Sequence, residues 1–200
     1  RDRLIDGVNV KDYDLQVLRD KVSIALQKPE IFSTTIAENI AWGDDSAGSE
    51  KIRQAADITQ ATEFIDTKPE KYKSPISQGG SNVSGGQKQR LSIARAIAKH
   101  PDVYIFDDSF SALDYKTDVT LRQALKKKTK DSTLLIVAQR ISTILHADQI
   151  IVLDDGQIVG KGTHKELLKN CEAYYQIASS QLSEKELEED LKEVESYAKR

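Results

Sequence analysis

The sequence Val103-Tyr104-Ile105-Phe106-Asp107-Asp108 sets two carboxylates directly after a run of apolar residues. A continuous apolar run of this length is typical of a strand that lies inside a parallel sheet. The carboxyl ends of such strands form the edge at which α/β sheets bind ligands, and a carboxylate there can hold Mg²⁺ directly or through water. The sequence therefore predicts a ligand site at Asp107 and Asp108.

Apolar segments alternate with helical segments on both sides of this run. Further strands are expected at 22–26, 133–137, 149–153 and 157–159, and helices at 91–98, 116–128, 141–145 and 165–168. Strands that alternate with helices favour a parallel α/β sheet. The pattern thus predicts an α/β core that contains the strand ending at Asp107.

The N-terminal part of the chain has a different character. Asp6-Gly7 between short apolar runs predicts a β-hairpin. Between residues 29 and 90 the pattern is mostly helical, and a helix capped by Thr34 or Thr35 is expected to run through Ile40. Two more helices are expected in this region, one capped by Ser49 and running through Ala56 and one over 59–64, followed by a loop over 72–81. These segments predict an inserted helical lobe.

Composition limits the classes of function. The chain has 200 residues, of which 38% are hydrophobic, enough for one domain with a core. Its 29 Lys and Arg residues against 32 Asp and Glu residues give a net charge of -3, which argues against a nucleic-acid partner. The single cysteine, Cys171, cannot form an internal disulfide. No apolar run approaches the roughly 20 residues that cross a bilayer, so membrane contact is expected through another segment.

Ser84-Gly85-Gly86-Gln87 stands directly before an apolar helical stripe. Ser84 and Gln87 fit a capping box, and the simplest interpretation is a well-capped helix. The two glycines add a second possibility, because without side chains they let an anion approach the backbone amides at a positive helix end. Such a site suits a terminal phosphate.

Read with Lys88-Gln89-Arg90 and the strand that ends at Asp107, this segment resembles the signature motif of ABC transporters, and the strand resembles their Walker B motif. The resemblance implies that ATP and Mg²⁺ are the ligands, with Asp107 on the magnesium side. Asp108 stands where the family usually has the glutamate that activates water. Its side chain is shorter by one C–C bond, roughly 1.5 Å. Because a misplacement of about 1 Å can cost around a hundredfold in rate, a poor base is expected.

The sequence also matches other motifs of the family, with one more departure from the usual residues. Ser111-Ala112-Leu113-Asp114 is similar to the D-loop, although a turn that caps the next helix would fit as well, and Gln27 resembles the Q-loop glutamine whose amide reaches the metal or its water. Gln139 occupies the usual switch histidine position, where it can bind a phosphate oxygen but cannot become cationic. Together, Asp108 and Gln139 resemble the degenerate, slow site of heterodimeric exporters.

The segments 32–40 and 74–80 resemble regions through which exporters meet their transmembrane coupling helices. The resemblance implies a second ABC nucleotide-binding domain and a transmembrane domain as partners, at the cytoplasmic face of the cell membrane. The family sandwiches ATP head to tail, so Ser84, Gly85, Gly86, Gln87 and Asp114 would serve the partner's site. Two alternatives are a non-hydrolysing regulatory module and a soluble ABC ATPase that acts on nucleic acid or ribosomes.

A P-loop would read Gly-x-x-x-x-Gly-Lys followed by Ser or Thr, and these 200 residues contain no such string. With no methionine at position 1, the chain is expected to be a fragment of a longer polypeptide that carries the P-loop earlier. The expected fold is a RecA-like P-loop NTPase core, truncated at its N-terminus. Its expected parts are the β region and Q-loop (1–28), the helical subdomain with the signature motif (29–95), the core (96–171) and the C-terminal helices (172–200).

Overall fold

The computed structural model describes residues 2–42, 44, 46–188 and 190. The chain divides into two compact units, Arg1–Val137 and Ala138–Arg200. Each unit has its own cluster of buried apolar side chains, and each is described by itself.

A three-stranded parallel sheet forms the centre of the first unit. Its strands are β3 (Val22–Ala25), β4 (Val103–Asp107) and β5 (Thr133–Val137), with β4 in the middle. The register pairs Ala25 with Phe106 and Asp107 with Val137, so the three carboxyl ends lie at one edge. The parallel α/β sheet that the sequence predicts is confirmed.

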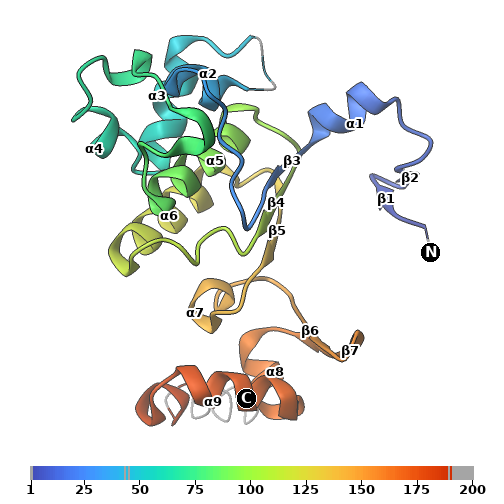
Figure 1. Ribbon diagram of the computed structural model, residues 1–200. Coiled ribbons are helices and arrows are strands. Elements are labelled where there is room, and N and C mark those ends of the chain that lie inside the picture. Colours follow the sequence, from blue (N-terminus) through green and yellow to red (C-terminus); the bar gives the residue numbers. More distant parts are fainter. Residues whose placement is uncertain (1, 43, 45, 189, 191–200) are drawn as a thin grey trace. The chain divides into compact units, whose positions relative to one another are not determined.

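The two faces of this sheet differ in burial. Helices α5 (Gly85–Ala98) and α6 (Tyr115–Lys128) supply side chains to the core that buries Tyr104 and Phe106 (Figure 1). On the opposite face Ile24 is 54% exposed and Leu135 is 51% exposed. The prediction of a buried strand at 22–26 is therefore correct for one face only, because alternate side chains of a strand point to opposite sides.

The predicted helical lobe is present as α2 (Ile36–Ala41), α3 (Ser49–Ile58) and α4 (Thr62–Ile65). Thr35 caps α2 in a capping box with Glu38, as one of the two expected alternatives requires. Ser49 is the first residue of α3 and not its cap, which is Gly48. The helix expected over 59–64 begins three residues later, because the backbone turns at Gln60 with a φ of 57°.

The N-terminal residues form the predicted hairpin of β1 (Leu4–Ile5) and β2 (Val8–Asn9). Both turn residues have positive φ, 51° at Asp6 and 79° at Gly7, as a two-residue hairpin turn requires. Helix α1 (Leu15–Lys21) follows and was not expected from the sequence. The Asp14 carboxylate caps α1 by accepting hydrogen bonds from two backbone amides.

The segment 72–81 is a loop with short 3₁₀ turns, η1 (Lys71–Lys73) and η2 (Gln78–Gly80). An isolated antiparallel bridge joins Thr35 to Pro75, which ties this loop to the start of α2. The two segments that resemble coupling-helix contacts therefore touch each other within the first unit.

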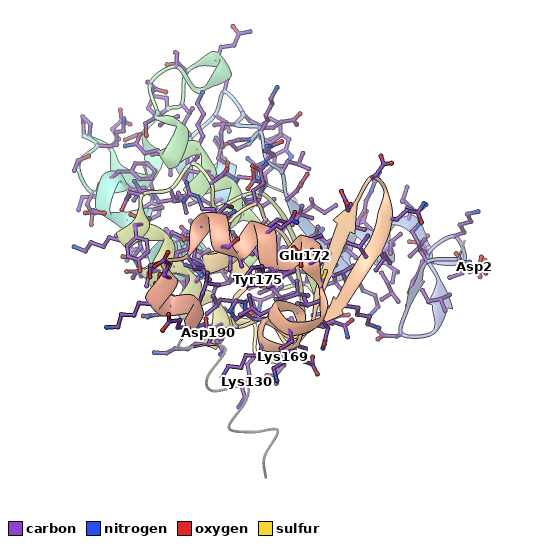
Figure 2. All side chains as sticks on the ribbon, turned by 90° about the horizontal axis from the view of Figure 1, so that it is seen from below. Asp2, Lys130, Lys169, Glu172, Tyr175 and Asp190 are labelled. Carbon is purple, nitrogen blue, oxygen red and sulfur yellow. The ribbon has the colours of Figure 1, made fainter. Side chains whose placement is uncertain are left out.

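The second unit contains α7 (Ile141–Ile144), β6 (Ile150–Asp154), β7 (Gln157–Gly162), α8 (His164–Asn170) and α9 (Glu172–Gln181). In Figure 2, Lys169 marks the end of α8, and Glu172 and Tyr175 mark α9. Strands β6 and β7 pair antiparallel across Asp155 and Gly156, so they do not extend the parallel sheet as the alternation suggested. The Thr163–Glu166 side chains form a capping box.

The sequence places Leu187 and the apolar residues at 191, 194 and 198 at helical spacing, which predicts an amphipathic terminal helix, and the structure describes only part of this segment. Leu187 is 7% exposed and belongs to the apolar cluster of the second unit. The other predicted apolar positions, at 191, 194 and 198, lie outside the described residues. Among the described helices, none combines the length and apolar character needed to cross a bilayer.

Candidate functional site

Two predicted site residues meet at the carboxyl edge of the parallel sheet. The Gln27 side chain donates a hydrogen bond from Nε2 to Oδ2 of Asp108 over 3.3 Å. Each residue lies two positions beyond the last registered pair of β3 and β4, Ala25 and Phe106. Residues 81 positions apart in the chain are thus brought together where a parallel sheet places ligands.

The backbone of Asp108 is held in an unusual conformation. Its φ is 44°, a left-handed region that few residues other than glycine adopt and that Asp tolerates better than most. The Asp108 amide donates to the Val137 carbonyl over 2.9 Å, which fixes this turn to the end of β5. The Asp108 carbonyl accepts a hydrogen bond from the Ser111 hydroxyl at 2.9 Å. The direction of the Asp108 side chain is therefore set by backbone contacts on both sides.

The predicted capping box at the start of the glycine-rich helix is confirmed. Ser84 is the N-cap of α5, with Ser84 Oγ accepting from the Gln87 amide and Gln87 Oε1 accepting from the Ser84 amide. A Cβ added to Gly85 would meet nothing within 4 Å, whereas one added to Gly86 would lie 3.3 Å from the Ala112 carbonyl oxygen. The position of Gly85 is therefore open at the positive end of α5, whereas Gly86 packs against the predicted D-loop.

Helix α5 is fastened to the segment that carries Gln27. Gln89, 1% exposed, donates from Nε2 to the Leu26 carbonyl over 3.2 Å. Arg95 reaches the Glu30 carbonyl at 3.0 Å and the Asn39 carbonyl at 2.8 Å. Buried hydrogen bonds of this kind are costly to break. The predicted signature helix and Q-loop segment are thus connected through side-chain contacts.

Asp114, predicted to belong to the D-loop, also has a structural role. It is the N-cap of α6, and its carboxylate accepts from the Thr117 hydroxyl at 2.7 Å and from the Thr117 amide at 3.0 Å. These hydrogen bonds hold the pKa of the Asp114 carboxyl below its usual value, because they stabilise the ionised form. The helix-capping alternative for this segment is therefore correct, and it is compatible with a D-loop.

The predicted metal position lies at the end of β4. Asp107 is the last residue of that strand, beside Asp108. Within the described residues, no three or more His, Cys, Asp or Glu side chains cluster as a metal site made of protein ligands alone. The donor set nevertheless fits Mg²⁺, which in proteins is usually bound by one or two carboxylates together with water and substrate phosphates.

Gln139 belongs to the second unit, and its contacts are described within that unit. Its backbone carbonyl accepts a hydrogen bond from the Gln181 side chain of α9 at 2.8 Å. The same side chain accepts from the Ile141 amide at 2.8 Å. Helix α9 thereby fixes the start of α7, where the predicted switch residue lies.

Thr163 and Glu166 fit a capping box in the sequence, which favours a structural role for the neighbouring His164 over a role as a ligand. Its Nδ1 lies 2.8 Å from the Tyr174 hydroxyl, and its Nε2 lies 3.1 Å from the carboxylate of Asp190, which Figure 2 labels. Burial of Tyr174, and to a lesser degree the charge of Asp190, raises the pKa of the tyrosine to about 12. The histidine is thus part of a buried network inside the second unit.

Sequence reasoning missed Ser109 and Gln89 as contacts of this site. Both are buried polar side chains that donate to backbone carbonyls at the end of β3. Their partners lie far away in the sequence, and the motif beside each residue can be explained without these contacts. The available signal was a serine and a glutamine at positions that an apolar core would otherwise fill.

Comparison with known proteins identifies the family. The sequence profile of the ABC transporter family matches residues 2–111. The chain belongs to the ABC transporter family. Within that family it is a nucleotide-binding domain of the exporter type, with the P-loop NTPase fold.

Similar proteins include mouse ATP-binding cassette sub-family B member 5, 43% identical over 88% of this chain and 14% of the relative. The ATP-dependent lipid A-core flippase of Photobacterium profundum is 44% identical over 87% of this chain and 30% of the relative. A solved bacterial Atm1-family ABC exporter with ATP bound has a TM-score of 0.86 and 34% identity, covering 90% of this chain and 32% of that one. The chain therefore spans less than a third of the length of these relatives.

Proposed function

We propose that this chain is the ATP-binding and ATP-hydrolysing domain of an exporter half that works as a heterodimer. The contact that carries the proposal is the hydrogen bond from Gln27 to Asp108 at the carboxyl edge of the parallel sheet. It joins the two groups that would face the attacking water. The similarity to a flippase and to an ATP-bound exporter supports a role in moving a substrate across a membrane.

In this proposal, each residue of the edge has a defined role. Asp107 and Gln27 would hold Mg²⁺, which would neutralise charge on the phosphates. Asp108 would orient water, but its short side chain is already engaged by the Gln27 amide. Gln139 would donate a hydrogen bond to a phosphate oxygen without acting as a proton carrier. This chain's own ATP site would therefore turn over slowly.

The start of α5 would serve the other ATP site. Within the segment Ser84-Gly85-Gly86-Gln87, the two glycines place backbone amides at a positive helix end, which suits the terminal phosphate of an ATP bound by the partner domain, while Ser84 and Gln87 form the cap. Asp114 would keep the neighbouring D-loop in place through its cap on α6. An intact signature next to a weak Walker site is the combination that favours two unequal ATP sites.

The partners in this proposal are a second, different ABC nucleotide-binding domain and the coupling helices of a transmembrane domain. The segments around α2 and the 72–81 loop would receive those helices at the cytoplasmic face of the membrane. Native mass spectrometry of the full-length protein, purified from its own membrane, is expected to give a one-to-one complex with a second ABC half. A complex that contains only copies of this chain would contradict the heterodimer.

The 200 residues alone are expected not to hydrolyse ATP. They contain no P-loop string, so the amides and the lysine that cradle the phosphates are missing. Release of phosphate from ATP by the purified 200-residue chain is the measurement. Magnesium-dependent turnover above the level of an Asp107→Asn variant would overturn this expectation.

A non-hydrolysing regulatory module is the second candidate. The observation that favours it is that the Gln27 amide donates a hydrogen bond to the Asp108 carboxylate, which occupies a donor and an acceptor that could otherwise contact the attacking water. Nucleotide trapping that finds ATP but no ADP at either site of the intact complex would favour it.

A further inference from the structure

We propose that Ser109 is a positioning residue of this ATP site, whose buried hydroxyl sets the separation between Gln27 and Asp108. The inference rests on the proposed function for the roles of those two residues. Ser109 would act through them, by holding the end of β3 against the turn that follows β4.

The contacts of Ser109 cross between the two strand ends. The residue is 0% exposed, and its Oγ donates to the Ala25 carbonyl over 2.7 Å. A longer contact of 3.3 Å leads to the Asp107 carbonyl. The registered pairs of β3 and β4 end at Ala25 and Phe106. The Ser109 hydroxyl is therefore a tie between the strands just beyond their ladder, on the side where the predicted catalytic residues lie.

The ends of β3 and β4 also make hydrogen bonds to other elements. Gln89 of α5 holds the Leu26 carbonyl from one side, and the Val137 carbonyl of β5 holds the Asp108 amide from the other. Each end is thus anchored to a different element. Of these contacts, the Ser109 hydrogen bond joins the two ends directly, and so it determines the spacing on which the 3.3 Å Gln27–Asp108 contact depends.

Loss of the hydroxyl would leave the buried Ala25 carbonyl without this donor. A buried acceptor that loses its partner is costly, so the strand end would shift or water would enter. A displacement of about 1 Å in a catalytic group can cost around a hundredfold in rate. A displacement of half that distance is expected to give a measurable loss of turnover rate. ATP binding is expected to change little, because Ser109 is not expected to contact the nucleotide.

The test uses the full-length protein assembled with its partner, whose own ATP site is silenced by replacing its catalytic acid. ATP turnover is measured in Ser109→Ala, Gln27→Ala and the double variant. We expect Ser109→Ala to lower kcat about tenfold with KM for ATP unchanged. We expect the double variant to lose no more than the stronger single variant, because Ser109 acts through Gln27.

Ser23→Ala is the matched control. Ser23 is also a buried serine on the same face of β3, two residues before Ala25, and it is 7% exposed. It should leave kcat unchanged. Ser109→Thr keeps the hydroxyl and should recover most of the turnover, with thermal unfolding measured in parallel to detect a variant that the added methyl group prevents from folding.

Two results would overturn the proposal: losses from Ser109→Ala and Gln27→Ala that multiply in the double variant, or an equal loss in Ser23→Ala. Failure of the proposed function would look different. It would appear as fast turnover of this site in the unmodified chain, and the coupling between Ser109 and Gln27 can be measured in that case too.

Discussion

Replacing Gly86 with leucine is expected to lower the ATPase activity of the intact transporter about a hundredfold or more. The added side chain would cover the amides at the start of α5, which we propose bind the terminal phosphate of the partner's ATP. Loss of preorganised backbone donors at a reacting phosphate has effects of about 10²–10³. Space is also short inside this chain, since a Cβ at Gly86 would lie 3.3 Å from the Ala112 carbonyl oxygen. Phosphate release by the reconstituted complex is the measurement.

Two comparison variants make this result specific. Gly48→Leu places the same side chain at the start of α3, where a Cβ meets nothing within 4 Å, and should leave the rate unchanged. Asp108→Asn should reduce total activity far less than Gly86→Leu, because fast turnover is proposed to occur at the partner's site. Equal losses from Gly86→Leu and Asp108→Asn would contradict the assignment of unequal sites.

The double variant Asp108→Glu, Gln139→His is expected to raise turnover at this chain's own site by about a hundredfold. The glutamate restores the roughly 1.5 Å of side chain that Asp108 lacks. The histidine adds a group that can carry a proton near neutral pH. Together they correct both departures in the proposed slow site, and a catalytic base that reaches its water is worth about 10²–10⁴ in rate. Turnover is measured with the partner's site silenced.

The single variant Asp108→Glu should give a smaller gain. Residue 108 has a φ of 44°, a conformation that Asp adopts more readily than Glu, so part of the benefit is lost as backbone strain. Adding Asp107→Asn to the double variant should remove the gain, because that carboxylate is proposed to hold Mg²⁺. A folded double variant with unchanged turnover would show that the two departures do not limit this site.

Local chemistry made several features predictable from the sequence. The capping boxes of Ser84 with Gln87 and of Thr163 with Glu166 use partners three residues apart, and both are present. The Asp6-Gly7 hairpin is set by two residues that adopt positive φ. The strand at 133–137 was predicted with its observed bounds, because an uninterrupted apolar run ends there.

Other features depend on information that short patterns do not contain. Helix α1 is capped by Asp14 and has no buried residue, so it does not show the burial of one face that a periodic sequence pattern predicts. Strands β6 and β7 pair antiparallel across Asp155 and Gly156, whereas the alternation of strands and helices indicated a parallel arrangement. The Gln27–Asp108 contact and the hydrogen bonds of Ser109 and Gln89 each join residues more than 60 positions apart, which no short pattern relates. The roles of the site residues stay predictions.

The open face of the parallel sheet governs how the isolated chain behaves in solution. Ile24, Leu135 and Val137 are each half-exposed there. Parallel sheets are usually covered on both faces, and a contiguous apolar patch favours association with another such patch. Colloidal stability of the 200-residue chain is therefore expected to fall as protein concentration and kosmotropic salt rise. The isolated chain is therefore expected to stay dispersed at low protein concentration or in detergent below its critical micelle concentration.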